Sequence, residues 1–328
     1  MKMITIVVPS YNEEESIADL YMRTTAVMRE MTGYRYEIII IDDGSTDKTR
    51  SIIEDLCKKD DHIKAIFSAR NFGYSKTIFY GLQQAQGDCA VLLHADMQNP
   101  PELIPKFVKQ WENGSKIVLG VKSGSKENKL MYFFRKCYYG LMNRISDVEH
   151  ISQATDFELL DKSFLDVLRA VHVNNPYLRG LIMEYGYDIK QVEYTQEKRV
   201  KGKTHFNFYK YYDFAMLGVT SNSKKVLRLA SIFGVFFLIA AAVGIGLGIV
   251  FQTINQEEIH EFITKMVIPV LLLIGGLQFF FIGLIGEYVL SIIGNASNKP
   301  ILIEKMRINF EDDQKAVNIV DIHQEELL

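Results

Sequence analysis

The sequence predicts an α/β domain with a mostly parallel sheet, followed by two transmembrane helices. Two observations lead to this fold class. Short apolar runs alternate with segments of helical periodicity in the first part of the chain, which is the pattern of βα units. The last third contains two long stretches without charge, and each is long enough to cross a bilayer. The 328 residues are enough for one large domain with an appendage, or for two domains.

The predicted strands are short apolar runs at residues 4–8, 37–41, 63–67, 89–93 and 117–121. Runs of this length and composition suit strands that are buried on both faces. Because helical segments separate them, the strands are expected to run parallel, with helices covering both faces of the sheet.

Helices are predicted in the connections between these strands. In the first connection, apolar residues recur three and four positions apart from Ile17 to Met31. The second connection begins with Ser45, Thr46 and Asp47, whose side chains can cap a helix. The third carries apolar residues at 78, 79 and 82, and the fourth opens at residues 100–101 with two prolines, which a first helical turn tolerates.

Two uncharged stretches, at residues 229–251 and 266–286, are predicted to span the membrane. Basic residues flank the pair, whereas glutamates dominate the loop between them; the basic residues are Lys224, Lys225, Arg228, Lys299, Lys305 and Arg307. By the positive-inside rule, the large domain and both termini face the cytoplasm of a cell with the spans in its inner or plasma membrane. The expected division is 1–205 for the cytoplasmic domain, 206–228 for an interfacial amphipathic segment, 229–294 for the membrane region and 295–328 for a cytoplasmic tail.

The bulk composition narrows the function classes. A net charge of −3 gives no indication of nucleic-acid binding. Cys57, Cys89 and Cys137 have neither disulfide-framework nor metal-ligand spacing, which favours a reducing compartment. No signal peptide is expected, because the chain runs directly into its first apolar strand. Residues 126–144 mix basic and aromatic side chains, which fits either a membrane-surface helix or an ordinary buried helix.

The polar loop after residues 89–93 is the most informative feature of the chain. Asp96 and Gln98 offer oxygen donors two positions apart, at the strand end where open α/β sheets bind ligands. Oxygen donors suit a hard cation such as Mg²⁺ or Mn²⁺. A cation held there can neutralise a diphosphate leaving group, which suggests nucleotide-sugar chemistry. His94 stands where a second carboxylate could have been expected.

Three further turns carry polar groups at the ends of predicted strands. They are Pro9, Tyr11 and Glu13 after the first strand, Asp42 and Asp43 after the second, and Arg70 after the third. An aromatic face and acids can hold a base and a ribose, and Arg70 can meet a phosphate bidentately. Helix capping also explains Ser45 and Asp47, and a surface loop would also explain Arg70.

Taken together, the four turns resemble the A-type catalytic domain of the family 2 glycosyltransferases. The motifs occur in the same order: P-x-Y-N-E-E, D-D-G-S-x-D-x-T, S-x-R-N-F-G, and a metal loop with Q-x-P-P-E. With two C-terminal spans, the chain resembles the polyprenyl-phosphate glycosyltransferases, which include dolichol-phosphate mannose synthases and bactoprenol-phosphate glucosyltransferases. The resemblance extends to about Ile303 and implies a Rossmann-like, mostly parallel sheet.

The resemblance also implies roles for individual residues. The implied nucleotide-sugar ligands are Pro9, Tyr11, Glu13, Asp42, Asp43, Arg70 and Ala95. Asp96 and Gln98 would bind Mg²⁺ or Mn²⁺, and Asp156 and Asp96 would be the catalytic residues. Cations for the diphosphate or the lipid phosphate would be Lys122, Arg135, Arg179, Arg199 and Lys203.

Several positions depart from the pattern of the family. His94 replaces the first acid of D-x-D, and Lys122 replaces an arginine, which loses bidentate geometry. Glu158 stands where arginine is common. Thr204-His205 occupies the place of Ser-Lys, which removes a fixed positive charge near neutral pH.

The function implied is transfer of a sugar from a UDP- or GDP-sugar, with UDP favoured, to a polyprenyl phosphate such as undecaprenyl phosphate. A single displacement with inversion is expected, and its lipid-linked product would supply cell-envelope glycan modification. Asp156 would position the acceptor or a cation. The alternatives are a processive polysaccharide synthase and a non-catalytic membrane scaffold of the same fold. Related enzymes also suggest a homo-oligomer.

Overall fold

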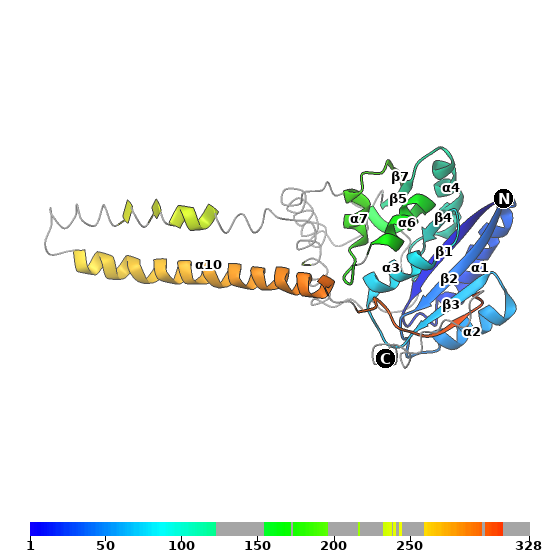
Figure 1. Cartoon of the computed structure of the whole chain (residues 1–328), viewed down its shortest axis with the longest axis horizontal. Helices are drawn as coiled ribbons and strands as arrows, with labels where there is room; N and C mark the ends of the chain where they lie inside the picture. Colours follow the sequence, from blue (N-terminus) through cyan, green and yellow to red (C-terminus); the bar gives the residue numbers. More distant parts are fainter. Residues whose placement is uncertain are drawn as a thin grey trace, which may run out of the picture.

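The computed structural model describes residues 1–122, 154–171, 173–195, 216, 232–237, 239–240, 243–244, 259–296 and 299–310. The strands are β1 (Lys2–Ser10), β2 (Tyr34–Asp42), β3 (Ile63–Ser68), β4 (Cys89–Leu92), β5 (Ile117–Lys122), β6 (Ala154–Asp161), β7 (Ile189–Tyr194) and β8 (Glu304–Ile308). They form one sheet in the order β7-β5-β6-β4-β1-β2-β3-β8 (Figure 1). All five predicted strands are present in it.

Strand direction brings the ends of distant segments to one edge of the sheet. β1 pairs in parallel with β2 and β4, β2 with β3, and β5 with β7. β6 is antiparallel to both β4 and β5, and β8 is antiparallel to β3. The sheet is therefore mostly parallel, as predicted. Because β6 runs in the opposite direction, it begins at the edge where β1 to β4 end.

Helices cover both faces of this sheet. They are α1 (Ile17–Glu30), α2 (Thr49–Lys59), α3 (Tyr74–Gln84), the 3₁₀ turn η1 (Pro101–Leu103), α4 (Ile104–Glu112), α6 (Lys162–Ala170) and α7 (Leu178–Glu184). Apolar residues of α1, α2 and α4 form one core with one face of the sheet, and those of α3, α6 and α7 form a second core on the other. The strands are apolar on both faces because both are covered.

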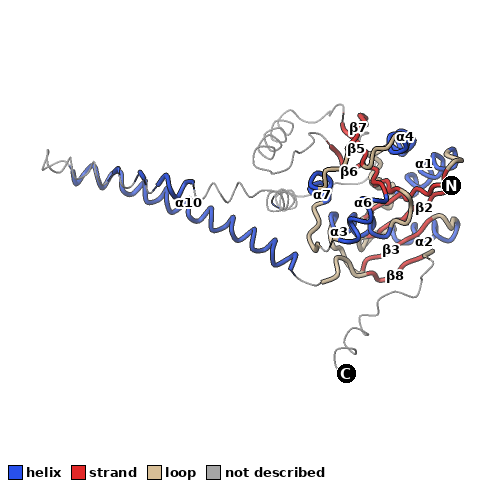
Figure 2. The backbone as a smooth tube through the Cα atoms, turned by 45° about the horizontal axis from the view of Figure 1, so that its top comes forward, coloured by secondary structure: helices blue, strands red, loops and turns tan. Residues whose placement is uncertain are grey.

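One long helix, α10 (Ile259–Ala296), projects from the head as a stalk (Figures 1 and 2). Its 38 residues span about 57 Å at 1.5 Å per residue, more than the hydrocarbon core of a bilayer. Residues Leu273–Leu290 make it long and apolar enough to cross a membrane, the one such helix among the described residues. Large apolar side chains such as Phe279 and Phe280 are exposed along it, which suits a lipid environment.

The other predicted span is described only in pieces. Residues 232–237, 239–240 and 243–244 are helical, and the ring of Phe233 lies 6.2 Å from that of Phe281 on α10. The remainder of 229–251 lies outside the described residues, so the expectation of two spans is met by one helix. Residues 126–144, and the interfacial segment 206–228 apart from Met216, also lie outside the described part of the chain.

The chain returns to the head after α10. β8 adds to the free side of β3, so residues 304–308, which the sequence-based division put in a cytoplasmic tail, are an edge strand of the sheet (Figure 2). Asn309 fixes the end of this strand, because its side-chain amide donates to the backbone oxygens of Cys57 and Ile63 at 2.9 and 2.8 Å. The stalk is thus followed by a strand of the head's own sheet.

Candidate functional site

The four predicted loops meet at one edge of the sheet. The parallel register pairs Ser10 with Asp42, so the loops after β1 and β2 leave the sheet side by side. Leu92, at the end of β4, lies opposite Glu158 of β6. Asp156 therefore reaches the same edge as the loop that carries Asp96. The strand order alone brings together loops that are up to about 150 residues apart in the sequence.

The loop after β1 is locked to the loop after β2. Asn12 takes the left-handed conformation with φ of 54°, its N–H donates to Ser45 Oγ at 2.9 Å, and its Oδ1 accepts from the N–H of Thr46 at 2.8 Å. Pro9 is buried at the end of β1, and Tyr11 and Glu13 lie half-buried in this loop. These contacts hold the loop with the predicted nucleoside ligands in a fixed conformation.

Asp42 and Asp43 are both buried, but their surroundings differ. Asp43 accepts hydrogen bonds from the N–H groups of Phe72 and Gly73 at 2.8 and 2.9 Å, so its carboxylate fixes the loop after β3. Asp42 accepts a 3.3 Å bond from Ser45 N–H through Oδ2, and its Oδ1 has no partner among the described residues. Burial raises the pKa of each carboxyl. Asp42 is therefore the better placed of the two to accept a hydrogen bond from a ligand.

The loop after β2 packs closely against the loop after β3. Gly44 has φ of 74°, and a Cβ there would lie 2.7 Å from the backbone carbon of Arg70. The guanidinium of Arg70 is exposed and sits 4.3 Å from the ring centre of Phe72. Arg70 therefore lies at the rim of the site, where a phosphate remains a predicted partner.

The predicted metal loop has a turn of its own. Ala95 is buried, Met97 has φ of 61°, and Asp96 Oδ1 accepts from the N–H of Gln98 at 3.1 Å. The described residues contain no cluster of three or more histidine, cysteine, aspartate or glutamate side chains that could hold a metal ion. Asp96 and Gln98 supply few protein donors, which fits a Mg²⁺ or Mn²⁺ that substrate phosphates bind in addition.

The Nε2 nitrogen of His94 is engaged by protein groups, so it is not available as a metal ligand. This nitrogen lies 3.2 Å from the hydroxyl of Tyr74 and 3.2 Å from the backbone oxygen of Asp156. A backbone oxygen can only accept, and the hydroxyl proton of Tyr74 is given to Asp156, so Nε2 carries a hydrogen. The imidazole also stacks on the ring of Tyr74 at 5.6 Å. His94 therefore joins the group around Asp156.

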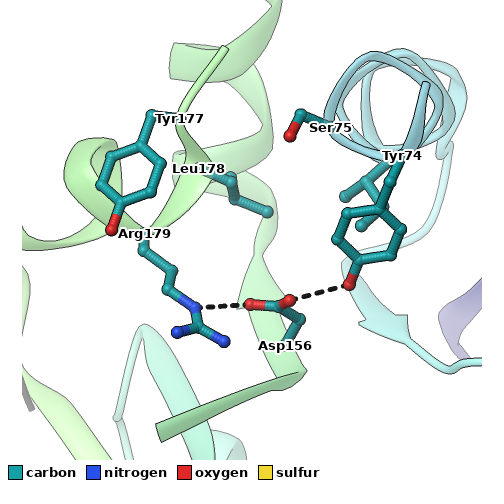
Figure 3. A pocket seen from close by; sticks show the side chains of 7 residues that line it. Tyr74, Ser75, Asp156, Tyr177, Leu178 and Arg179 are labelled. Carbon is teal, nitrogen blue, oxygen red and sulfur yellow. Dashed lines mark hydrogen bonds and ion pairs between the residues drawn. The ribbon is translucent and has the colours of Figure 1, made fainter. Parts of the chain in front are cut away.

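Asp156 is held by two side chains from different helices (Figure 3). Arg179, at the start of α7, donates from Nε to Oδ1 at 2.6 Å, and Tyr74, at the start of α3, donates to Oδ2 at 2.7 Å. The three residues line a pocket together with Ser75, Ile78, Tyr177 and Leu178. Arg179 was predicted as a phosphate ligand, whereas Tyr74 was not predicted at all. Its only signal in the sequence is its position directly after the S-x-R-N-F-G motif.

The electrostatics of this group keep Asp156 ionised. Burial alone would raise the pKa of its carboxyl, but the charge of Arg179, together with His94 and the hydrogen bond from Tyr74, lowers the pKa below its ordinary value. Burial and the neighbouring carboxylate raise the pKa of Tyr74 well above the usual value, so its hydroxyl keeps its proton. Asp156 is consequently a weak proton acceptor and a fixed negative charge in the pocket.

A buried polar chain supports the site from below. Asn99 Nδ2 donates to Tyr194 Oη at 3.1 Å, Tyr194 donates to Thr155 Oγ1 at 3.0 Å, and Thr155 donates to the backbone oxygen of Gly120 at 2.9 Å. The chain links the Asp96 loop to β7, β6 and β5. None of these three side chains was predicted, since each is unremarkable until the strand order brings them together.

The predicted cations divide into two groups. Lys122 is half-buried at the end of β5, and Arg179 is bonded to Asp156. Arg135, Arg199 and Lys203 lie outside the described residues, as does His205.

Comparison with known proteins gives a consistent result. Residues 5–186 match the family described as glycosyl transferase family 2. The prophage bactoprenol glucosyl transferase homolog of Escherichia coli (strain K12) is 32% identical over 289 residues, which cover 87% of this chain and 93% of that protein. The SfII prophage-derived bactoprenol glucosyl transferase of Shigella flexneri is 31% identical over 303 residues, covering 92% and 97%. The crystal structure of glucosyl-3-phosphoglycerate synthase from Mycobacterium tuberculosis in complex with phosphoglyceric acid shares 17% identity, with a TM-score of 0.47 and coverage of 67% and 79%.

Proposed function

Since this chain belongs to glycosyl transferase family 2, we propose that it transfers a sugar from a nucleotide-diphosphate sugar to a polyprenyl phosphate. The observation that supports this function most directly is the ionised Asp156. Arg179 and Tyr74 hold it at the sheet edge from which the Asp42 and Asp96 loops also extend. The names of the two relatives support bactoprenol phosphate, an undecaprenyl phosphate, as the acceptor and a glucosyl group as the transferred sugar. UDP-glucose is therefore our first choice of donor.

The donor would lie across the loops after β1, β2 and β4. The Oδ1 of Asp42, which has no partner in the described part of the chain, is suited to an N–H or hydroxyl of the nucleoside, beside Tyr11 and Glu13. Asp96 and Gln98 would hold a Mg²⁺ or Mn²⁺, and a bound cation neutralises charge on a diphosphate leaving group. Arg70 at the rim, and Lys122 at the end of β5, would add positive charge for phosphates.

The reaction needs no strong general base. A phosphate monoester is largely ionised near pH 7, because its second pKa is about 6. Its oxygen would form the new bond to the anomeric carbon while the bond to the diphosphate breaks, and the nucleoside diphosphate leaves with the electron pair. A direct displacement of this kind inverts the anomeric configuration. The lowered pKa of Asp156 supports a positioning role for this carboxylate, since a weak proton acceptor contributes little as a base.

The acceptor would come from a membrane that α10 crosses. Its apolar window of 18 residues suits the hydrocarbon core, and the head would then lie on the cytoplasmic side with both termini. In Figure 1, α3 and α7, which carry Tyr74 and Arg179, lie on the side of the head from which α10 projects. This arrangement supports delivery of a lipid phosphate to the Asp156 pocket and a lipid-linked sugar for the cell envelope.

The test is a transfer assay on the full-length protein in lipid nanodiscs that contain undecaprenyl phosphate. Labelled UDP-glucose, UDP-galactose, UDP-N-acetylglucosamine and GDP-mannose are supplied one at a time with Mg²⁺ or Mn²⁺, and label in the lipid fraction is counted. We expect one UDP-sugar to label the lipid, with inverted configuration at the anomeric carbon. Asp156→Asn should abolish labelling, whereas Asp61→Asn, at an exposed position near the opposite end of β3, should not.

Two results would reject the proposal. Label that stays out of the lipid with every donor would exclude a lipid-phosphate transferase. Label that enters a long water-soluble polymer would instead support a processive polysaccharide synthase.

A further inference from the structure

Glu158 is a buried acid without a hydrogen-bond partner at one oxygen. Its residue is only 1% exposed, and its Oε1 is unpartnered among the described residues. It lies two positions after Asp156 on β6, so both side chains are on the same face of the sheet. In the strand ladder it is flanked by Leu92 of β4 and Leu119 of β5, which offer no charge.

The titratable groups around Glu158 come from four elements. Asp156 lies on β6 itself, Arg179 reaches in from α7, and the hydroxyl of Tyr74 comes from α3. His94, in the loop after β4, lies against the Tyr74 hydroxyl and the backbone oxygen of Asp156. On α6, which also packs against β6, Asp166 and Arg169 pair with each other. Arg179 is therefore the one cation that acts on Glu158 among these groups, and its Nε is bonded to Asp156 at 2.6 Å.

The electrostatic balance at Glu158 follows from this arrangement. Burial, followed by repulsion from Asp156, raises the pKa of the Glu158 carboxyl to about 8, and attraction to Arg179 only partly offsets the rise. The two carboxylates and the one guanidinium are thus close enough to interact electrostatically. Ionising both acids would leave one buried negative charge without compensation.

We propose that Glu158 carries its proton in the working enzyme and acts as a positioning residue, leaving Arg179 to the carboxylate of Asp156. This inference rests on the proposed transferase function, because the effect of the Glu158 proton is measured as a change in the rate of transfer. Loss of the proton adds a second negative charge beside the first, and the two carboxylates then compete for Arg179. In this proposal, the bonds that Asp156 makes to Arg179 and Tyr74 in Figure 3 belong to the state in which Glu158 is protonated.

The test compares pH profiles of transfer by the full-length protein in nanodiscs. Wild-type activity should fall about tenfold from pH 7 to pH 9, following the fraction of protonated Glu158. Glu158→Gln keeps the shape of the side chain but cannot ionise, so its ratio of activity at pH 9 to that at pH 7 should stay close to one. Glu184→Gln, at an exposed position on α7, should keep the wild-type ratio. Equal ratios in wild type and Glu158→Gln would overturn the proposal.

Infrared difference spectroscopy on the detergent-solubilised full-length protein gives a readout that does not need turnover. The carbonyl band of a protonated carboxylic acid should be present at pH 7, lost as the pH rises through 8, and missing from Glu158→Gln. A missing band in the wild type would overturn the inference even if the enzyme is active. A band that titrates in a protein with no transfer activity would support the protonated Glu158 and reject the proposed function instead.

Discussion

The hydroxyl of Tyr74 donates a 2.7 Å hydrogen bond to Asp156 Oδ2, joining the first turn of α3 to the first residues of β6. The two residues are separated by 82 positions in the sequence, and both lie at the carboxyl edge of the sheet. Together with Arg179 and His94, this bond fixes the carboxylate in one orientation and one ionisation state. The site is thus formed by the loops at the strand ends together with Tyr74 at the start of α3.

Tyr74→Phe should lower kcat roughly ten- to hundredfold, because a hydrogen bond to a charged group contributes about 1.5–3 kcal/mol. The ring and its stacking on His94 remain, so folding should be unaffected. Steady-state transfer kinetics in nanodiscs measure the effect. Tyr80→Phe is the matched control, since Tyr80 also lies on α3 and donates to a carboxylate, Glu304, outside the site. A kcat loss of the same size in both variants would contradict a specific role for Tyr74.

Arg179→Gln should move the acid limb of the pH–rate profile to higher pH. Arg179 is the largest cause that lowers the pKa of Asp156, and without it burial raises the pKa of that carboxyl. The ionised form would then be lost at a higher pH as the solution is acidified. At pH 7 the rate should fall roughly a hundredfold, as for other removed electrostatic partners.

The control for this prediction is Arg23→Gln, which removes a half-exposed pair with Glu102 at 2.7 Å. Exposed pairs contribute about 0–1 kcal/mol, so its pH profile should match that of the wild type. An unchanged acid limb in Arg179→Gln would mean that this cation does not control the ionisation of Asp156.

Much of the fold could be predicted because β1 to β5 are continuous apolar runs. A strand buried on both faces has this signature, and the helices between them show their own period. β6 was missed because Asp156 and Glu158 alternate with the buried Phe157 and Leu159, so it lacks the continuous apolar run of the other strands. β8 was missed because Lys305 and Arg307 make it look like a solvated tail, although pairing with β3 at a separation of more than 200 residues makes it a strand.

The site was predictable where motifs mark strand ends and less so elsewhere. Asp96 was predicted from its place at the end of an apolar run and Asp156 from the family resemblance, but the hydrogen bonds that use Asp43 to hold a loop follow from backbone geometry. Tyr74 could not be separated from the many tyrosines that pack in helices. Its role follows only from the distance to Asp156 across the sheet edge.

Gly44→Ala should weaken donor binding by distorting the loops after β2 and β3. A side chain at φ of 74° costs about 1–2 kcal/mol, and its Cβ would also meet the backbone of Arg70 at 2.7 Å. Calorimetric titration with UDP should give a Kd raised roughly tenfold or more. Gly33→Ala is the control, since nothing lies within 4 Å of a Cβ there. Equal affinities in the two variants would argue against a donor site at these loops.

Asp96→Asn should weaken Mn²⁺ binding and lower transfer roughly a hundredfold, because the neutral amide loses the charge that a hard cation prefers. Electron paramagnetic resonance of Mn²⁺ in the presence of UDP separates the binding effect from turnover. Asp55→Asn, at an exposed position on α2, should bind Mn²⁺ as the wild type does. Full Mn²⁺ affinity in Asp96→Asn would remove this residue from the proposed metal site.

Glu304→Ala should destabilise the head, because the Glu304 carboxylate on β8 binds a side chain of α3 and a second side chain of β8. Its carboxylate accepts from Tyr80 at 2.7 Å and from Arg307 Nε at 2.7 Å, and these side chains are largely buried. Loss of the acceptor leaves two donors unpaired, which should lower the free energy of unfolding by about 2 kcal/mol.

Trp111, the single tryptophan, is buried against the sheet, so its fluorescence reports unfolding of the head in detergent. Glu54→Ala, which removes a half-exposed i,i+4 pair with Arg50, should cost at most about 0.5 kcal/mol. Equal stabilities of the two variants would show that the strand following the stalk is not anchored through Glu304.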